Sequence, residues 1–386
     1  MSGFPPFRGR SLSDVIVIGG GIAGCSTAYF LASDGADVTL LEQFELGTLA
    51  SGANAGSLHA QIQPEPFAEF GMSWARRFLP ALPFFAQSMA MWREFGSEFG
   101  EDLEVSQTGG LVLATTDRCM RLMEAKIRLE RDAGLDTQLW TAEEVRHRAP
   151  YVSRRVIGGA YCPMEGQANP LTATVAIGRA AEALGAAVLT GQRVVAIHRI
   201  RTGLEVTTDR GSYRAASVVN AAGNDAARIA GLLGGHLDIQ SQPIQLCVTE
   251  PVAPIIDHLV YSASDLLTLK QTRRGTVLIG GGWPAEIDGR SRPRVAGGSL
   301  LNNLRVAVDA VPAIASARIV RTWAAEVNGN ASWLPIIGEI PASGGFYVNC
   351  VPWMGFSGAP AAGRIVASLV QGREPPVDYD ISAFRP

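Results

Sequence analysis

A glycine-rich turn between an apolar run and a helical segment constrains the fold of this chain more than any other feature. Residues 14–18 form a short β-branched run without polar alternation, which predicts a parallel strand buried on both faces. A Gly-x-Gly-x-x-Gly motif spans residues 19–24, a helix is predicted over 24–36, and a second strand over 37–42 ends at Glu42. This order predicts a dinucleotide-binding β-α-β unit within a doubly wound α/β fold.

The three glycines and the acid have separate roles in such a unit. Gly19 permits a tight turn, Gly21 lets the backbone approach a pyrophosphate, and Gly24 lets the helix pack on the strand. The helix N-terminus offers unpaired N–H groups and the positive end of its dipole to the diphosphate. Glu42 can accept hydrogen bonds from both ribose hydroxyls, which disfavours NADP. NAD and FAD both fit this motif, so the choice between them depends on the rest of the chain.

Composition limits the class of protein. The 386 residues can hold two or three average domains, and a hydrophobic content of 47% is that of an ordinary globular enzyme. The net charge is −3 and no dense Lys/Arg cluster is visible, so neither nucleic acid nor an anionic membrane is an expected partner. The five cysteines are scattered, and no metal site is expected. Without a secretory signal or an apolar run long enough to span a membrane, we expect a reduced, cytoplasmic protein.

Hydrophobic periodicity and turn signals divide the remaining chain into helices and strands. Two helices are predicted within 67–99, and further helices over 117–133, 141–148, 169–184, 299–311 and 361–371. Strands are predicted over 103–115, 187–189, 194–197, 217–221, 245–250, 266–270, 276–280 and 346–349. We therefore expect a doubly wound, Rossmann-like domain and a mixed α+β substrate domain with an antiparallel sheet. The first should comprise residues 13–90, 150–238 and 322–386, and the second residues 91–149 and 239–321.

Five further segments carry a resemblance to a known family. In chain order they are residues 51–56 (Ser-Gly-Ala-Asn-Ala-Gly), 166–170 (Gly-Gln-Ala-Asn-Pro), 218–223 (Val-Val-Asn-Ala-Ala-Gly), 334–338 (Leu-Pro-Ile-Ile-Gly) and 355–360 (Gly-Phe-Ser-Gly-Ala-Pro). Together they resemble the D-amino-acid oxidase-like flavoproteins, which include glycine oxidase, sarcosine oxidase and bacterial amino-acid dehydrogenases. The resemblance covers nearly the whole chain, and it implies that the doubly wound domain binds FAD rather than NAD.

The resemblance also implies which residues contact FAD. Residues 51–56 would run along the pyrophosphate and the flavin edge, Val194 would lie by the adenine, and residues 355–358 would begin the last helix and face the flavin N1–C2=O region. The strand at 322–327 has no cysteine of the kind that attaches flavin in sarcosine oxidase-like relatives, which implies noncovalent FAD. The expected cofactor contacts are Gly19, Gly21, Ile22, Ala23, Gly24, Glu42, Gln43, Ser51, Ala53, Asn54, Ala55, Gly56, Ser57, Leu58, Val194, Ala221, Ala222, Gly223, Gly355, Phe356, Ser357 and Gly358.

The way the substrate is held is less determined. In the family, an amine lies over the flavin and loses a hydride from its α-carbon to N5, so no protein base is strictly required. Members that act on simple amino acids often fix the carboxylate with an arginine, but the two corresponding positions here are Val327 and the region of Trp353. This departure favours a differently anchored acid or a bulkier amine, such as an opine or an imino acid. Arg273, Arg274 and Arg321 are candidate substitutes.

Three residues are the candidate catalytic groups: His59, Tyr261 and Arg273. His59 follows the segment expected to pass the flavin ring and is the best placed of the five histidines, with a structural histidine as the alternative. Tyr261 either covers the substrate or belongs to the core of its lobe. Sarcosine oxidase-like relatives place a lysine near flavin N5 to promote the reaction with oxygen, and Lys270 is not expected to occupy that position.

Three functions remain open from the sequence. The first is an FAD-dependent dehydrogenase that oxidises a CH–NH or CH–NH2 bond of an amino acid, imino acid or opine. Residues 51–58 are most similar to the flavin subunits of heteromeric opine and hydroxyproline dehydrogenases, which implies partner subunits that carry further redox centres. The second is a stand-alone D-amino-acid or secondary-amine oxidase that forms hydrogen peroxide. The third is a flavin-binding subunit whose catalytic site lies in a partner.

Overall fold

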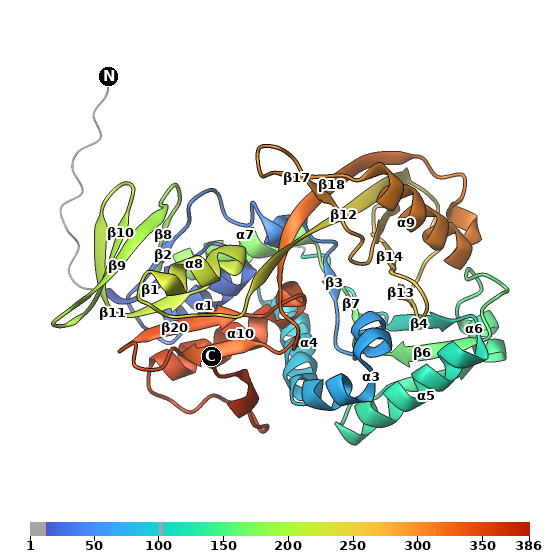
Figure 1. The fold of residues 1–386 in the computed structure, drawn as a ribbon, viewed down its shortest axis with the longest axis horizontal. Helices are drawn as coiled ribbons and strands as arrows, with labels where there is room; N and C mark the ends of the chain where they lie inside the picture. Colours follow the sequence, from blue (N-terminus) through green and yellow to red (C-terminus); the bar gives the residue numbers. More distant parts are fainter. Residues whose placement is uncertain (1–12, 100–102) are drawn as a thin grey trace.

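Two eight-stranded sheets organise the chain in a computed structural model that describes residues 13–99 and 103–386. The first sheet forms the left half of the molecule in Figure 1 and the second sheet the right half. Helices α3 and α4 lie at the lower edge between them, and α10 lies beneath the first sheet (Figure 1). The doubly wound domain and the mixed α+β domain expected from the sequence are therefore both present.

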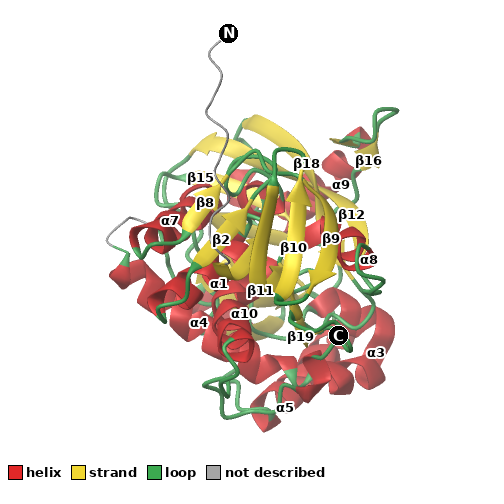
Figure 2. Cartoon of the chain, turned by 90° about the vertical axis from the view of Figure 1, so that its left-hand side faces the viewer, coloured by secondary structure: helices red, strands yellow, loops and turns green. Residues whose placement is uncertain are grey.

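The first sheet has the parallel core of a doubly wound fold (Figure 2). Its order is β19-β20-β11-β1-β2-β8, with β9 and β10 added as an antiparallel extension of β11. The central strand β1 pairs in parallel with both β11 and β2, so the carboxyl ends of these strands meet at one edge. The strands are β1 (Ser13–Ile18), β2 (Val38–Leu41), β8 (Ala187–Leu189), β9 (Val194–Ile200), β10 (Gly203–Thr208), β11 (Ser212–Asn220), β19 (Ile336–Glu339) and β20 (Phe346–Cys350).

Strand β1 is covered on both faces, as its apolar run predicts. Val15 and Val17 belong to the core shared with α1, while Ile16 and Ile18 belong to the core on the opposite face. On the α1 side, α1 (Ile22–Ser33) contacts both α7 (Pro170–Ala183) and α10 (Gly355–Val370), and α4 (Ala81–Glu98) packs against α10. The opposite face is covered by α8 (Ala226–Gly231).

The second sheet is antiparallel except for one pair. Its order is β18-β12-β15-β14-β13-β4-β6-β5, and only β13 and β4 run parallel among these neighbours. Its strands are β4 (Gly110–Ala114), β5 (Gln138–Thr141), β6 (Gly158–Cys162), β12 (Gln240–Pro251), β13 (Leu259–Ser262), β14 (Thr268–Gln271), β15 (Thr276–Gly280) and β18 (Ile319–Gly329). The remaining elements are α2 (Ala50–Ala53), β3 (Ser57–Leu58), α3 (Pro64–Phe78), α5 (Asp117–Asp132), α6 (Ala142–Arg148), β7 (Gly166–Gln167), β16 (Glu286–Ile287), β17 (Pro293–Arg294) and α9 (Gly297–Ala310).

Sheet membership differs from the expected domain boundaries at two places. Strand β6 lies after residue 150 and most of β18 lies after residue 322, yet both pair within the second sheet. Strand β18 is held along most of its length by β12, from the Gln240–Gly329 pair to the Thr249–Ile319 pair. The chain therefore returns to the first sheet only after residue 329.

The last helix begins at Gly355, six residues before the start at 361 expected from the local pattern and within residues 355–358, where the family resemblance places it. Helix α10 contains Pro360 near its N-terminus, and proline removes one intrahelical hydrogen bond. The carbonyl of Ser357 in this first turn accepts hydrogen bonds from Ser88 Oγ at 2.6 Å and Trp92 Nε1 at 3.1 Å. Helix α4 thus supports the turn that the proline weakens.

Within the residues that the structure describes, no helix combines the length and the apolar character needed to cross a bilayer.

Candidate functional site

The glycine turn packs too closely for side chains. A Cβ on Gly24 would lie 1.8 Å from the carbonyl oxygen of Gly19, and a Cβ on Gly19 would lie 2.5 Å from the carbonyl oxygen of Ala221. Gly19 also has a φ of 110°, in the region that favours glycine. Strand β11 thus delivers residues 221–223 to the turn at 19–24, and the structure brings these two predicted cofactor segments together.

Glu42 lies at the carboxyl end of β2, beside this turn. Its Oε2 accepts a hydrogen bond from the Gly20 amide at 2.6 Å and its Oε1 accepts one from the Phe44 amide at 2.7 Å. The hydroxyl of Ser51 accepts from the amide of Ile22 at 2.9 Å, which ties α2 to the N-terminus of α1. A side-chain-free turn, a helix N-terminus and a buried carboxylate are the groups that a dinucleotide diphosphate and ribose require. These residues fit the nucleotide end of FAD.

The two segments expected beside the flavin ring are bonded to each other. The amide of His59 donates to Ser357 Oγ at 2.8 Å, and Ser357 Oγ donates to the Ser57 carbonyl at 3.2 Å. Gly56 has a φ of 73°, and a Cβ there would lie 2.1 Å from the Ala168 carbonyl oxygen. The turn at Gly56 therefore sets the path by which residues 57–59 reach the N-terminus of α10.

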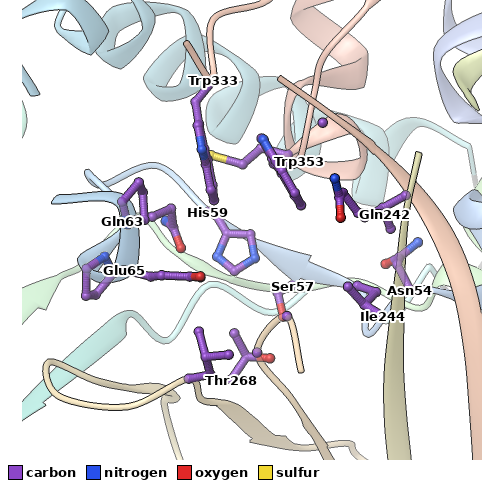
Figure 3. A pocket seen from close by; sticks show the side chains of 18 of the residues that line it. Asn54, Ser57, His59, Gln63, Glu65, Gln242, Ile244, Thr268, Trp333 and Trp353 are labelled. Carbon is purple, nitrogen blue, oxygen red and sulfur yellow. The ribbon is translucent and has the colours of Figure 1, made fainter. Parts of the chain in front are cut away.

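A cavity of about 650 Å³ opens against these segments. It lies against strands β12, β13 and β18 of the second sheet, helix α3 and the start of α10, and Figure 3 shows His59 near its centre, with Trp333 and Trp353 on one side and Thr268 on the other. Expected cofactor contacts and catalytic residues that line it are Asn54, Ala55, Ser57, His59, Tyr261, Phe356 and Ser357. The cavity is the candidate site for the flavin ring and the substrate.

The two candidate catalytic residues His59 and Tyr261 form a hydrogen bond. His59 Nδ1 and the Tyr261 hydroxyl are 2.6 Å apart, and the same hydroxyl donates to Glu165 Oε2 at 3.0 Å. Burial first, and then the charge of Lys270, lower the pKa of His59 from 6.5 to about 3. Burial raises the pKa of Tyr261 well above its ordinary value, with Glu165 as the next cause. At neutral pH the site therefore holds an uncharged imidazole beside a protonated phenol.

Glu165 is fully buried and joins a larger polar network. Its Oε1 accepts from the amides of Ala60 at 2.6 Å and Gln61 at 2.9 Å, and its Oε2 accepts from Gln61 Nε2 at 2.6 Å. Gln61 Oε1 in turn accepts from Lys126 Nζ at 2.5 Å, and Lys126 pairs with Glu130 at 2.7 Å. Burial raises the pKa of Glu165, and the hydrogen bonds from Ala60 and Gln61 oppose that shift. The network links helix α5 to the cavity wall.

Lys270 contacts Ser57, one of the residues that line the cavity. Its Nζ donates to Ser57 Oγ at 3.1 Å, and its side chain is only 2% exposed. Burial lowers the pKa of Lys270 well below its ordinary value. Strand β14 thus places a buried amine against the segment expected to pass the flavin ring.

The candidate arginines lie elsewhere. Arg273 is exposed in the turn between β14 and β15 and lines a separate cavity of about 220 Å³. Arg274 pairs with Glu104 at 3.7 Å, and Arg321 lies 5.8 Å from the ring centroid of Trp323. The structure therefore does not bring Arg273 to the cavity that His59 and Tyr261 line.

The cavity lining is acidic and aromatic. Val327 and Trp353, the positions that correspond to family arginines, both line it. Trp353 stacks on Trp333 with ring centroids 5.1 Å apart and an interplanar angle of 20°. The carboxylates that line the cavity are Glu65, Glu69, Asp238 and Asp265. These groups can hold the amine end of a substrate through charge and through aromatic faces.

Sequence reasoning did not select Glu165, and it considered Lys270 only as the lysine near flavin N5 and set it aside. Glu165 directly precedes the 166–170 segment that carries part of the family resemblance, and this was the one signal available for it. Lys270 is separated from Ser57 by 213 residues and meets it only through the folding of β14. Neither position has a spacing pattern that marks it as functional.

A comparison with protein-family models matches residues 14–369 to DAO, the FAD-dependent oxidoreductases. The chain belongs to this family and is an FAD-dependent oxidoreductase. This confirms the resemblance found in the sequence and the choice of FAD over NAD.

Individual relatives span nearly the whole chain. A sarcosine oxidase subunit beta from Arthrobacter sp is 28% identical over 94% of this chain and 87% of its own length. A glycine oxidase from Geobacillus kaustophilus is 27% identical over 96% of both chains, and its crystal structure superposes with a TM-score of 0.85 over 97% of this chain and 98% of that one. The structure of an L-proline dehydrogenase from P. horikoshii is 25% identical, with a TM-score of 0.86 over 97% of both chains.

Proposed function

We propose that this protein oxidises a C–N bond of an amino acid, an imino acid, an opine or a related amine. The observation that carries the proposal is the position of His59, whose backbone is bonded to Ser357 and whose ring lines the cavity beside Tyr261. Bound FAD supplies the hydride acceptor for the α-carbon of the substrate. The chain's own residues hold the amine, orient it and exclude water. Relatives named for glycine, sarcosine and L-proline support this substrate class.

The cavity favours a substrate that is not anchored by an arginine–carboxylate pair. Val327 and Trp353 offer an aliphatic and an aromatic surface, whereas Glu65 and Glu69 carry negative charge. A bulky amine, with its cationic part near the acidic residues, fits this lining better than glycine or D-alanine does.

The test is an anaerobic screen of D- and L-amino acids, prolines, sarcosine and opines for bleaching of the flavin absorbance near ~450 nm. We expect at least one bulky or secondary amine to reduce the flavin, with glycine reducing it poorly. If no amine bleaches the flavin, even in the presence of partner subunits, the proposal is wrong and the chain is a non-catalytic flavin-binding subunit.

Two electron acceptors are each supported by a separate observation. Likeness to a sarcosine oxidase subunit beta supports a dehydrogenase that works as the β-subunit of a heteromeric complex. The buried amine of Lys270 beside Ser57 supports the alternative, a stand-alone oxidase that passes electrons to oxygen, since sarcosine oxidase-like relatives use a lysine near flavin N5 for that step.

Stopped-flow reoxidation of photoreduced enzyme distinguishes these two acceptors. For the stand-alone oxidase, we expect rapid reoxidation by air, stoichiometric peroxide and at least a tenfold slower reoxidation in Lys270→Met, about 1.4 kcal/mol of activation free energy. For the β-subunit, we expect slow reoxidation in both proteins and copurification with partner redox subunits. We also expect acid precipitation to release the FAD, because β18 has no cysteine to bind it covalently.

A further inference from the structure

We infer that Glu165 and Tyr261 hold His59 in the tautomer that carries its proton on Nδ1, so that Nε2 presents a hydrogen-bond acceptor to an N–H group of the substrate. Glu165 and Tyr261 are then positioning residues, and His59 is the group that touches the substrate. The tautomer follows from the hydrogen bonds alone. That the group bound by Nε2 is a substrate amine rests on the proposed function.

The first step is the direction of the hydrogen bond at Glu165. Three N–H groups, from the backbone of Ala60 and Gln61 and from the Gln61 side chain, already point at its two oxygens. The Gln61 amide cannot be reversed without cost, because its Oε1 accepts from Lys126 Nζ. Donors on both oxygens stabilise the ionised carboxylate, which can only accept hydrogen bonds. The fourth neighbour, the Tyr261 hydroxyl, must therefore donate to it.

The second step is the direction of the hydrogen bond at His59. A phenol has one hydrogen to donate, and Tyr261 donates it to Glu165. The 2.6 Å contact with His59 Nδ1 must then be a hydrogen bond from Nδ1–H to the phenol oxygen. A neutral imidazole with its proton on Nδ1 carries its lone pair on Nε2.

The third step is what Nε2 can bind. Within the described part of the chain, no hydrogen-bond partner is found for Nε2, and the ring lines the cavity. Figure 3 shows the carboxylate of Glu65 directed toward the same part of the cavity as the His59 ring. Both groups are acceptors, so this part of the cavity pairs with donors and disfavours a carboxylate. A primary or secondary amine has an N–H group in its reactive neutral form, whereas a tertiary amine has none.

The direct test reads the tautomer by NMR and needs no substrate. The FAD-loaded full chain is labelled with 15N in the histidine rings, and long-range 1H–15N correlations are recorded at neutral pH, with His59→Gln to assign the signal. We expect the His59 signal of the Nδ1–H form. An Nε2–H form or an imidazolium overturns the inference, whether or not the enzyme oxidises any amine.

The Tyr261→Phe variant tests the positioning role. Without the phenol oxygen, Nδ1–H loses its acceptor, so we expect the NMR signal to report a mixture of tautomers. For a primary or secondary amine we expect KM to rise about tenfold, the loss expected for one hydrogen bond, with a smaller change in kcat. The control is Tyr213→Phe, which removes a tyrosine hydroxyl on strand β11 of the first sheet that is bonded to Gln192. An unchanged tautomer in Tyr261→Phe overturns the role given to Tyr261.

Glu165→Gln extends the test to the buried carboxylate. In the glutamine variant, an NH2 group replaces one of the two carboxylate oxygens that accept hydrogen bonds from these donors. Tyr261 should then turn its hydrogen toward His59 Nδ1, and the tautomer of His59 should switch to Nε2–H. Glu165→Gln is compared with the wild type only if the circular dichroism and FAD absorbance of the two proteins match. If Glu165→Gln does not fold, Tyr261→Phe supplies the result. A folded Glu165→Gln that keeps the Nδ1–H form overturns the inference.

Discussion

The backbone amide of His59 and the hydroxyl of Ser357 are joined by a hydrogen bond of 2.8 Å across 298 residues of sequence. The same hydroxyl donates to the carbonyl of Ser57 at 3.2 Å. One buried side chain at the N-terminus of α10 therefore fixes the strand segment that carries the candidate catalytic histidine.

Replacing Ser357 with alanine should destabilise the protein and displace His59. The change leaves a buried amide and carbonyl without their partner, at a cost of about 1–3 kcal/mol. We expect a lower Tm and weaker FAD binding, measured by circular dichroism and flavin fluorescence. The control is Ser97→Ala, which removes an exposed hydroxyl that donates to the Arg93 carbonyl within α4 and should have no effect. Equal melting temperatures for both variants would contradict this prediction.

Glu42→Gln should weaken FAD binding and leave the fold intact. The carboxylate accepts from the amides of Gly20 and Phe44 and is expected to accept from the ribose hydroxyls, so neutralising it removes charge-assisted hydrogen bonds. We expect the Kd of FAD to rise about ten- to hundredfold, measured by titrating the apoprotein. Glu45→Gln, which neutralises an exposed carboxylate in the same loop, is the matched control. A Glu42→Gln variant with wild-type affinity would show that Glu42 is a structural residue only.

Lys126→Met should be the most destabilising of these substitutions. Both Lys126 and Glu130 are fully buried, and their ion pair of 2.7 Å is supported by Gln61. Removing one partner leaves an uncompensated buried charge, which costs about 3–5 kcal/mol. We expect a clear fall in Tm, and partial recovery in the double variant Lys126→Met, Glu130→Gln. If the double variant is less stable than the single one, the loss comes from packing rather than from charge.

Stability should fall as pH is lowered below 6.5. The pKa of His59 falls from 6.5 to about 3 in the folded protein, so the unfolded chain binds the additional proton across that window. The free energy of unfolding then decreases with falling pH, by at most about 1.4 kcal/mol per pH unit for this one proton. Thermal melts at decreasing pH measure the slope, and His59→Gln should make it shallower.

Other groups around His59 affect the same pH window. Its neighbours are Tyr261 on β13, Lys270 on β14, Glu165 before β7 and Glu65 on α3. The pKa of Glu65 is raised by burial and by Glu69, so its folded state gains protons on acidification and opposes the effect of His59. The comparison with His59→Gln therefore isolates the histidine. Identical slopes in the two proteins would mean that His59 titrates normally.

Local sequence patterns predicted those elements of the fold that depend on residues close together in the sequence. The run at β1, the glycine spacing and Glu42 specify the β-α-β unit without help from distant contacts. The local pattern alone placed the start of α10 too late, because the support that α4 gives to the turn around Pro360 is not visible in a local window, whereas the family resemblance placed it at residues 355–358. Glu165 reaches Tyr261, and Lys270 reaches Ser57, only through the pairing of β7 with β3 and the placement of β14. Arg273 was selected by residue type, and a tight turn directs it to another cavity.

The parallel core of the first sheet is assembled from the two ends of the chain: β1 pairs with β11, and β11 pairs with β20 close to the C-terminal helix. During synthesis on the ribosome, the glycine turn emerges early and the α10 N-terminus emerges more than three hundred residues later. The part of the cavity that α10 lines therefore cannot form until residue 355 has been translated.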